Sequence, residues 1–162
     1  MNEAPNPAIE GRAELVGAWR QLLLTASESG ARELVCVDAD FVDWPLDEPA
    51  VIDALQRWAR PHGRVFRMLS SDFEPVARRC PRFAAWRRDW AHRFEARCPG
   101  ADDRIELPSL LLAGAQAVEV LDRERWRARH VTAPADLRAL YEQCEAIAQR
   151  CEPAWPATTL GL

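Results

Sequence analysis

The chain has 162 residues, of which 48% are hydrophobic and 28% charged, and it carries a formal net charge of −4. These totals are ordinary for a globular protein, so they exclude wholesale disorder, and the length fits a single domain over residues 1–162. No stretch approaches the roughly 18 uninterrupted apolar residues that span a membrane, and the acidic, Pro-rich start has no signal-peptide pattern. We therefore expect a cytoplasmic protein without membrane contacts.

Three residue types narrow the chemistry further. All 21 basic residues are arginine, so a Walker A loop, a Schiff base and a lysine general base are excluded. The five cysteines are odd in number and form no C-x-x-C pair, which is typical of reduced thiols in the cytosol. No two histidines or cysteines stand at a zinc-site spacing, so we expect no metal site and no cofactor.

The first half of the chain alternates helices and strands. Apolar residues recur at helical spacing over residues 10–28, and a short apolar run at 33–38 predicts a buried strand. Pro49 opens a second helix, which ends before a second apolar run at residues 64–69. A strand, a helix and a strand this close together predict a right-handed parallel crossover unit.

The second half begins with a Ser-x-x-Glu capping box at residues 71–74, which predicts a short helix. Pro81 starts a longer helix that carries an aromatic stripe at core spacing: Phe83, Trp86, Trp90 and Phe94. Three short apolar segments then predict strands at 104–107, 109–113 and 116–121. A final helix begins near Pro134, and we expect a flexible N-terminus over residues 1–9 and an extended, Pro-rich tail over residues 152–162.

Polar side chains follow both predicted parallel strands. Because the carboxyl ends of parallel strands share one edge of a sheet, and ligands of α/β proteins bind outside that edge, these side chains form the first candidate site. The residues expected to bind there are Asp38, Asp40, Asp43, Ser70, Ser71 and Asp72. The structural alternative is that the carboxylates lie in a solvated loop and that Ser71 or Asp72 caps a helix.

The residues around this site resemble the first two motifs of haloacid-dehalogenase-like phosphatases: an apolar run followed by Asp-x-Asp-x-Val, then a second apolar run followed by Ser. That resemblance implies an enzyme in which Asp38 attacks phosphorus, Asp40 acts as acid and base, and Ser70 holds phosphate beside Mg²⁺. The chain departs from the pattern because Phe41 follows Asp40 where glycine is usual, and because the family's phosphate-binding lysine is missing.

The second candidate site is the basic segment at residues 78–97, which has seven arginines against two carboxylates and so a net charge of +5. Arg87 flanks the aromatic stripe, where it either extends its stem over apolar surface or binds a small anionic ligand or an acidic protein. Binding of nucleic acid needs exposed aromatic rings, and the core spacing of the stripe argues against it, as does the net charge of the chain.

The order of predicted elements, with residues 33–58, 64–72 and 109–126, is similar to one half of a phospholipase-D-like protein. It resembles most an uncharacterised bacterial family of lone halves that end in a Ser/Cys-Glu-Pro stretch, as at residues 151–153, and the similarity extends over residues 12–155. The resemblance implies an α/β fold with a single central mixed sheet flanked by helices. It also implies a homodimer, since such halves commonly pair.

Active phospholipase-D-like enzymes carry His-x-Lys-x4-Asp at the strand that here reads LPSLLLAGAQ. This chain has no histidine between His92 and His130 and no lysine, so the covalent phosphohistidine mechanism is excluded. We therefore expect a non-catalytic binding or regulatory module, with a Mg²⁺-dependent phosphatase as the alternative. Strand direction separates the two, because a haloacid-dehalogenase sheet is parallel throughout its core whereas a phospholipase-D-like half mixes directions in its last strands. Trp126 is the expected centre of the dimer contact, with Trp44 and Trp155 as alternatives.

Overall fold

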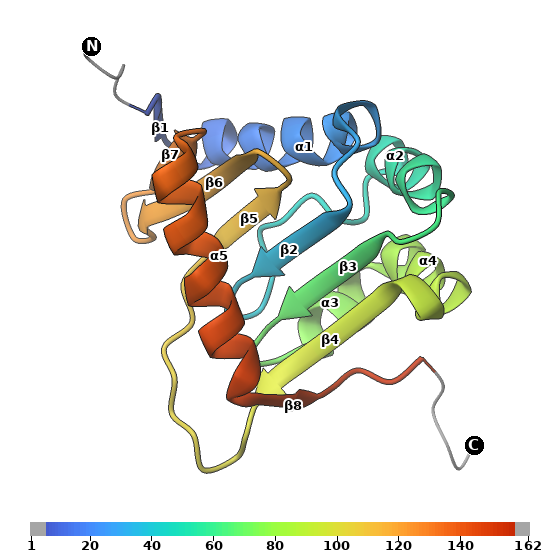
Figure 1. The fold of residues 1–162 in the computed structure, drawn as a ribbon. Helices are drawn as coiled ribbons and strands as arrows, with labels where there is room; N and C mark the ends of the chain where they lie inside the picture. Colours follow the sequence, from blue (N-terminus) through green and yellow to red (C-terminus); the bar gives the residue numbers. More distant parts are fainter. Residues whose placement is uncertain (1–5, 158–162) are drawn as a thin grey trace.

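The computed structural model describes residues 6–157 and contains one mixed sheet of eight strands with helices on both faces (Figure 1). The strands are β1 (Ala8–Glu10), β2 (Glu33–Val37), β3 (Val65–Leu69), β4 (Phe94–Pro99), β5 (Leu110–Ala113), β6 (Gln116–Asp122), β7 (Arg127–Val131) and β8 (Cys151–Pro153). The helices are α1 (Arg12–Ser29), α2 (Pro49–Ala59), α3 (Glu74–Arg79), α4 (Pro81–Asp89) and α5 (Pro134–Gln149), and a 3₁₀ turn spans Ala91–Arg93.

The sheet has the order β1-β7-β6-β5-β2-β3-β4-β8 and combines two kinds of pairing. Strands β2, β3 and β4 are parallel, because a helical crossover returns the chain between them. Strands β5, β6 and β7 are antiparallel hairpin neighbours, and β5 pairs antiparallel with β2. One border of the sheet, which we call the carboxyl edge, therefore contains the carboxyl ends of β2, β3 and β4, together with the end of β6 and the start of β7.

Two hydrophobic clusters lie on the two faces of the sheet. Helices α1 to α4 cover one face, where Trp19, Trp58 and Trp86 are among the largest fully buried side chains. Helix α5 alone covers the other face, and its buried residues Leu137 and Leu140 belong to the cluster that includes the inward side chains of β2 (Figure 1). This division explains the nearly continuous apolar sequence of β2, since a strand covered on both faces has no polar side.

The structure corrects the expected elements between residues 81 and 107. Helix α4 ends at Asp89 instead of continuing through the aromatic stripe, and Phe94 is the first residue of β4, where it stands beside Phe66 of β3. Phe83 and Trp86 are buried as expected, but Trp90 and Phe94 are only half-buried. No strand forms over residues 104–107, and β1, β4, β7 and β8 were not predicted.

Both ends of the described chain are extended. Residues Ala8–Glu10 form β1, paired with β7, where a flexible segment was expected over residues 1–9; residues 1–5 lie outside the described part. The expected extended tail begins with β8, which pairs with β4, and residues 158–162 of that tail lie outside the described part as well. Within residues 6–157, no helix has the length and apolar character needed to cross a membrane.

All five cysteines are free thiols. Three are buried and two are half-buried: Cys36, Cys144 and Cys151, then Cys80 and Cys98. Burial raises the pKa of the Cys144 thiol to about 12, so this side chain stays protonated and packs as a small apolar group beneath α5.

Trp86 and Trp90 provide a matched test of the revised helix end. Trp86 is 2% exposed and packs edge-on against Phe66, so Trp86→Ala should lower the free energy of unfolding by about 3–5 kcal/mol. Trp90→Ala removes a half-buried ring beyond the end of α4 and should lower the free energy of unfolding by clearly less than Trp86→Ala does. Urea denaturation of both variants measures the difference, and equal losses would contradict the observed end of the helix.

Candidate functional site

Asp38 is the first residue after β2 and is fully buried at the carboxyl edge. Its Oδ2 atom accepts hydrogen bonds from the backbone N–H groups of Asp40, at 3.2 Å, and Phe41, at 2.8 Å. The Asp40 carboxylate in turn accepts the backbone N–H of Val42 at 3.1 Å. Phe41 adopts a φ of 59°, in the left-handed region that residues other than glycine seldom adopt. The hydrogen bonds that the two carboxylates accept stabilise the tight turn that contains it.

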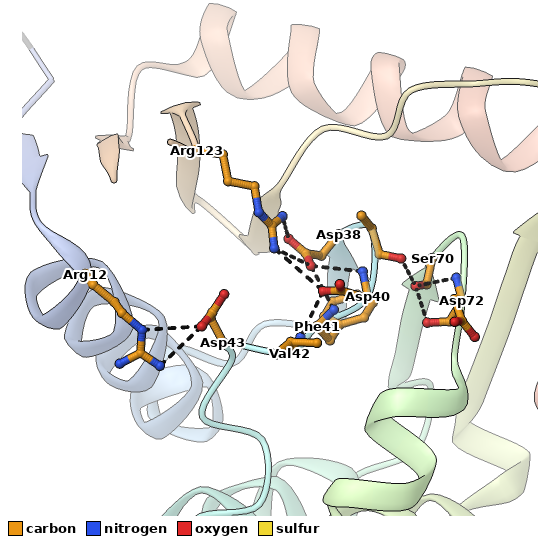
Figure 2. Close-up of polar contacts among 10 residues, drawn as sticks. Arg12, Asp38, Asp40, Phe41, Val42, Asp43, Ser70, Asp72 and Arg123 are labelled. Atoms are coloured by element: carbon orange, nitrogen blue, oxygen red, sulfur yellow. Dashed lines mark hydrogen bonds and ion pairs between the residues drawn. The ribbon is translucent and has the colours of Figure 1, made fainter. Parts of the chain in front are cut away.

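Arg123 completes this site from the hairpin between β6 and β7 (Figure 2). Its Nη1 lies 2.5 Å from Asp38 Oδ1 and its Nη2 lies 3.3 Å from Asp38 Oδ2, so the guanidinium binds both oxygens of the carboxylate. Its Nη2 also lies 3.7 Å from Asp40 Oδ1. Sequence reasoning missed this partner because 85 residues separate it from Asp38 and no local pattern connects them.

The ion pair determines the charge state of Asp38. Burial by itself raises the pKa of this carboxyl, but the hydrogen bonds and positive charge of Arg123 outweigh burial and hold the pKa below its usual value of 3.8. For Arg123, burial lowers the pKa, and the carboxylates of Asp38 and Asp40 reverse that effect and raise it. Both groups are therefore charged at neutral pH, and both oxygens of Asp38 are already engaged.

The other predicted residues of this edge are structural. The Ser70 hydroxyl is buried within 2.9 Å of the carbonyl oxygen of Ala39 and 3.0 Å of that of Asp72, so it fastens the loop after β3 to the loop after β2. The Asp72 carboxylate accepts the backbone N–H of Glu74 at the start of α3, and the backbone N–H of Ser71 donates to Ala39. Neither Ser71 nor Asp72 is the N-cap of α3, which is Phe73, so the expected capping box does not form.

Asp43 connects the edge to the start of α1. Its Oδ1 lies 3.2 Å from Nη2 of Arg12, and the Arg12 guanidinium also lies 5.7 Å from the ring centre of Trp126 (Figure 2 shows the Arg12–Asp43 pair). Trp126 is half-buried, and its carbonyl oxygen accepts the backbone N–H of Gly11. The carboxyl edge therefore contains two charge-compensated Arg–Asp pairs rather than a free cluster of carboxylates.

Several chemically active side chains lie away from this edge. His62 precedes β3, His92 precedes β4, and His130 lies near the end of β7, so all three histidines lie toward the opposite border of the sheet. Arg87 lies on α4 against Phe94 and the C-terminal segment, and the structure does not bring it to the carboxylates. Among residues 6–157, no three His, Cys, Asp or Glu side chains gather in a way that could hold a metal ion.

A further residue of the edge, Ser109, also had no signal in the sequence. It is buried and immediately precedes Leu110, which pairs with Val37 of β2, so it lies beside the buried carboxylate of Asp38. The strand that follows Ser109 is β5, which is antiparallel to β2. Its direction distinguishes the phospholipase-D-like fold from the haloacid-dehalogenase-like fold, the two folds that the sequence suggested. A strand running opposite to β2 within the core of the sheet fits a phospholipase-D-like half and does not fit a haloacid-dehalogenase sheet.

We predict that Asp38→Asn lowers the free energy of unfolding at pH 7 by about 1–3 kcal/mol, because it leaves Arg123 without a charged acceptor. The folded pKa of Asp38 is lower than its unfolded value, so the stabilisation is complete above pH 3.8 and is lost as the pH falls through the folded pKa. Urea titrations from pH 7 to pH 2 should show the two proteins converging in acid. A constant difference would contradict the ion pair as its source.

The sequence matches no family model and no curated protein. Solved structures that are similar in fold include the following three. TrmBL2, an archaeal chromatin protein described as showing a novel mode of DNA binding, has a TM-score of 0.66 at 13% identity, over 94% of this chain and 56% of that one. NucT from Helicobacter pylori has a TM-score of 0.58 at 7% identity, over 92% and 98% of the two chains.

The third is Nuc from Salmonella typhimurium, a phospholipase D family member, with a TM-score of 0.55 at 10% identity over 83% of this chain and 90% of that one. This chain spans little more than half the length of the archaeal protein. Identities this low establish a shared fold and no shared activity. The chain has the α/β fold of phospholipase-D-like proteins, with one mixed sheet flanked by helices.

Proposed function

We propose that this chain is a non-catalytic binding or regulatory module on a phospholipase-D-like scaffold, acting in the cytoplasm without a cofactor. The closed ion pair between Asp38 and Arg123 carries the proposal. A nucleophilic carboxylate needs a free oxygen facing its substrate, whereas each oxygen of Asp38 is bound by a guanidinium nitrogen or by backbone N–H groups.

The composition of the chain supports the same proposal. There is no lysine, and the three histidines lie toward the border opposite Asp38. The histidine nucleophile of the His-x-Lys-x4-Asp motif therefore has no counterpart at the carboxyl edge, and the cations there, Arg123 and Arg12, are paired with carboxylates. The alternative of a Mg²⁺-dependent phosphatase gains no support, because the three residues it would use are bound to other protein groups.

We also propose that two copies pair through the carboxyl edge. The described chain exposes three large hydrophobic side chains, and two of them lie here: Leu121, 59% exposed at the end of β6, and Val42, 43% exposed in the loop after β2. Trp126 adds a half-buried ring. The charges between them are already paired within one copy, which reduces the penalty of covering them, and a two-fold contact would bury this patch twice.

The other two tryptophans considered for this contact are less suitable. Trp44 is buried and stacks on Trp19 with ring centres 4.4 Å apart, so it covers the core of its own chain. Trp155 packs among phenylalanine rings beside β4, away from the carboxyl edge of β2. Trp126 thus remains the best-placed ring for the proposed pairing.

Sedimentation tests the pairing. At micromolar concentration the wild type should have twice the mass of the 18.3 kDa chain, and Leu121→Asp should be monomeric because it buries a charge on both sides of the contact. Val65→Asp is the matched control, since Val65 is also exposed but lies at the start of β3, at the opposite border. A monomeric wild type, or equal effects of the two variants, would exclude pairing through this edge.

Hydrolysis assays test the absence of catalysis. Wild type and Asp38→Asn should release p-nitrophenol from p-nitrophenyl phosphate and from bis(p-nitrophenyl) phosphate at the same background rate in millimolar Mg²⁺. Activity that is present in the wild type and lost in Asp38→Asn would instead establish the phosphatase alternative.

A further inference from the structure

Arg87 carries a buried positive charge that no carboxylate among residues 6–157 balances. The residue is 6% exposed, and among the described residues its one hydrogen bond runs from Nη2 to the carbonyl oxygen of Trp155, at 2.5 Å. Its Nε and Nη1 atoms are buried without an acceptor in that part of the chain. A buried guanidinium normally has a carboxylate partner, so two unsatisfied nitrogens mark an incomplete environment.

Aromatic rings surround the position that Trp155 fills. The indole stacks on Phe73 with ring centres 5.8 Å apart, meets Phe94 edge-on at 5.7 Å and lies 6.0 Å from Phe83. The Arg87 guanidinium lies 4.6 Å from the ring centre of Phe94. We call these three phenylalanines and Arg87 the socket. It combines apolar walls that fit one aromatic ring with a cation at the end where the backbone carbonyl of Trp155 now sits.

Few backbone hydrogen bonds hold the segment that fills the socket. We call this segment, residues Ala154–Ala157, the strap. It follows β8 and runs beside β4 (Figure 1). After the end of β8 at Pro153, the backbone of the strap is joined to the sheet by the hydrogen bond from the Ala154 N–H to the Ala96 carbonyl. Trp155 adopts a φ of 42°, a left-handed conformation that costs free energy for any residue except glycine.

We propose that the socket is a binding site for an aromatic carboxylate and that the strap occupies it as an internal ligand. An incoming ring would replace the indole of Trp155. Its carboxylate would replace the Trp155 carbonyl at Nη2 and would also bind Nε or Nη1, the two nitrogens that have no acceptor among residues 6–157. Charge-assisted hydrogen bonds are stronger than the single bond to a neutral carbonyl, so a carboxylate is favoured over an uncharged ring of the same shape.

The proposal goes beyond the proposed function because it assigns a ligand class and a displaceable cover to a different set of residues. It uses none of the residues of the proposed pairing contact. A failed test here would therefore leave the pairing and the absence of catalysis untouched, and failure of either of those would leave the socket intact.

The probe is N-acetyl-L-tryptophan, which has an indole and a carboxylate, and its uncharged counterpart is N-acetyl-L-tryptophanamide. Trp155→Gly empties the socket and also relieves the left-handed backbone. Calorimetry should show that this variant binds the acid at least about ten-fold more tightly than it binds the amide, the least that an added charge-assisted contact provides. The wild type should bind the acid more weakly than the variant does, because the strap competes.

Two further variants distinguish a specific site from non-specific binding of the probe. Arg87→Leu combined with Trp155→Gly should lose the preference for acid over amide. Tyr141→Ala removes a half-buried ring from α5, on the other face of the sheet, and should leave the affinity for the acid at the wild-type value. Equal binding of acid and amide by Trp155→Gly, or tighter binding in Tyr141→Ala as well, would overturn the proposal.

A measurement on the wild type keeps the proposal testable if Trp155→Gly does not fold. The indole N–H resonance of Trp155 should shift on titration with millimolar acid and should not shift with the amide. A resonance that is unchanged by the acid would overturn the proposal independently of any variant.

Discussion

The carboxyl edge of this protein depends on one ion pair that spans a strand. Asp38 at the end of β2 and Arg123 in the β6–β7 hairpin face each other across the start of β5. The carboxylate is fully buried, and so it must be compensated where it stands, by the guanidinium and by the N–H groups of the turn that follows. That turn leads to Asp43, which holds Arg12 at the start of α1. Because Arg123 is 41% exposed, its Coulombic contribution is screened, and much of the importance of the pair lies in satisfying the buried carboxylate.

The same arrangement determines what the carboxyl edge presents. A phospholipase-D-like scaffold gathers the ends of several strands at one edge. Here those ends present groups that bind one another: a serine that joins two loops, an aspartate that accepts a backbone N–H at the start of α3, and two Arg–Asp pairs. The fold supplies the position and the side chains decide its use, so similarity of fold to phospholipase D family members does not transfer their chemistry.

Local sequence patterns predicted the strands that are mostly apolar and missed those that are very short or carry several polar residues. β2 and β5 leave nearly continuous apolar runs because they are covered on both faces, and β3 and β6 each have one charged residue within an apolar run. FEARCP in β4 and RARHV in β7 contain arginines whose heads reach solvent or carboxylates, so their alternation was too weak to detect. The aromatic stripe was misread because Phe94 has helical spacing from Trp90 by coincidence, although the backbone leaves the helix between them.

For the candidate site, the shared edge of parallel strands correctly brought Asp38 and Ser70 together, because that rule depends on topology alone. Neither Arg123 nor Ser109 could be predicted, since contacts between distant segments follow from the order of the strands in the sheet.

The pairing of β1 with β7 has a consequence for how the chain acquires its structure. Ile9 stands opposite Ala128, so the first strand has no partner until the hairpin of β6 and β7 has been synthesised and formed. Until then the backbone of β1 stays unpaired. The side chain of Ile9, which is fully buried in the folded protein, stays exposed to water. Closing so long a loop costs entropy that only an already assembled sheet repays, which places this contact late in folding. β1 therefore leaves the ribosome before β7 but joins the sheet only after it.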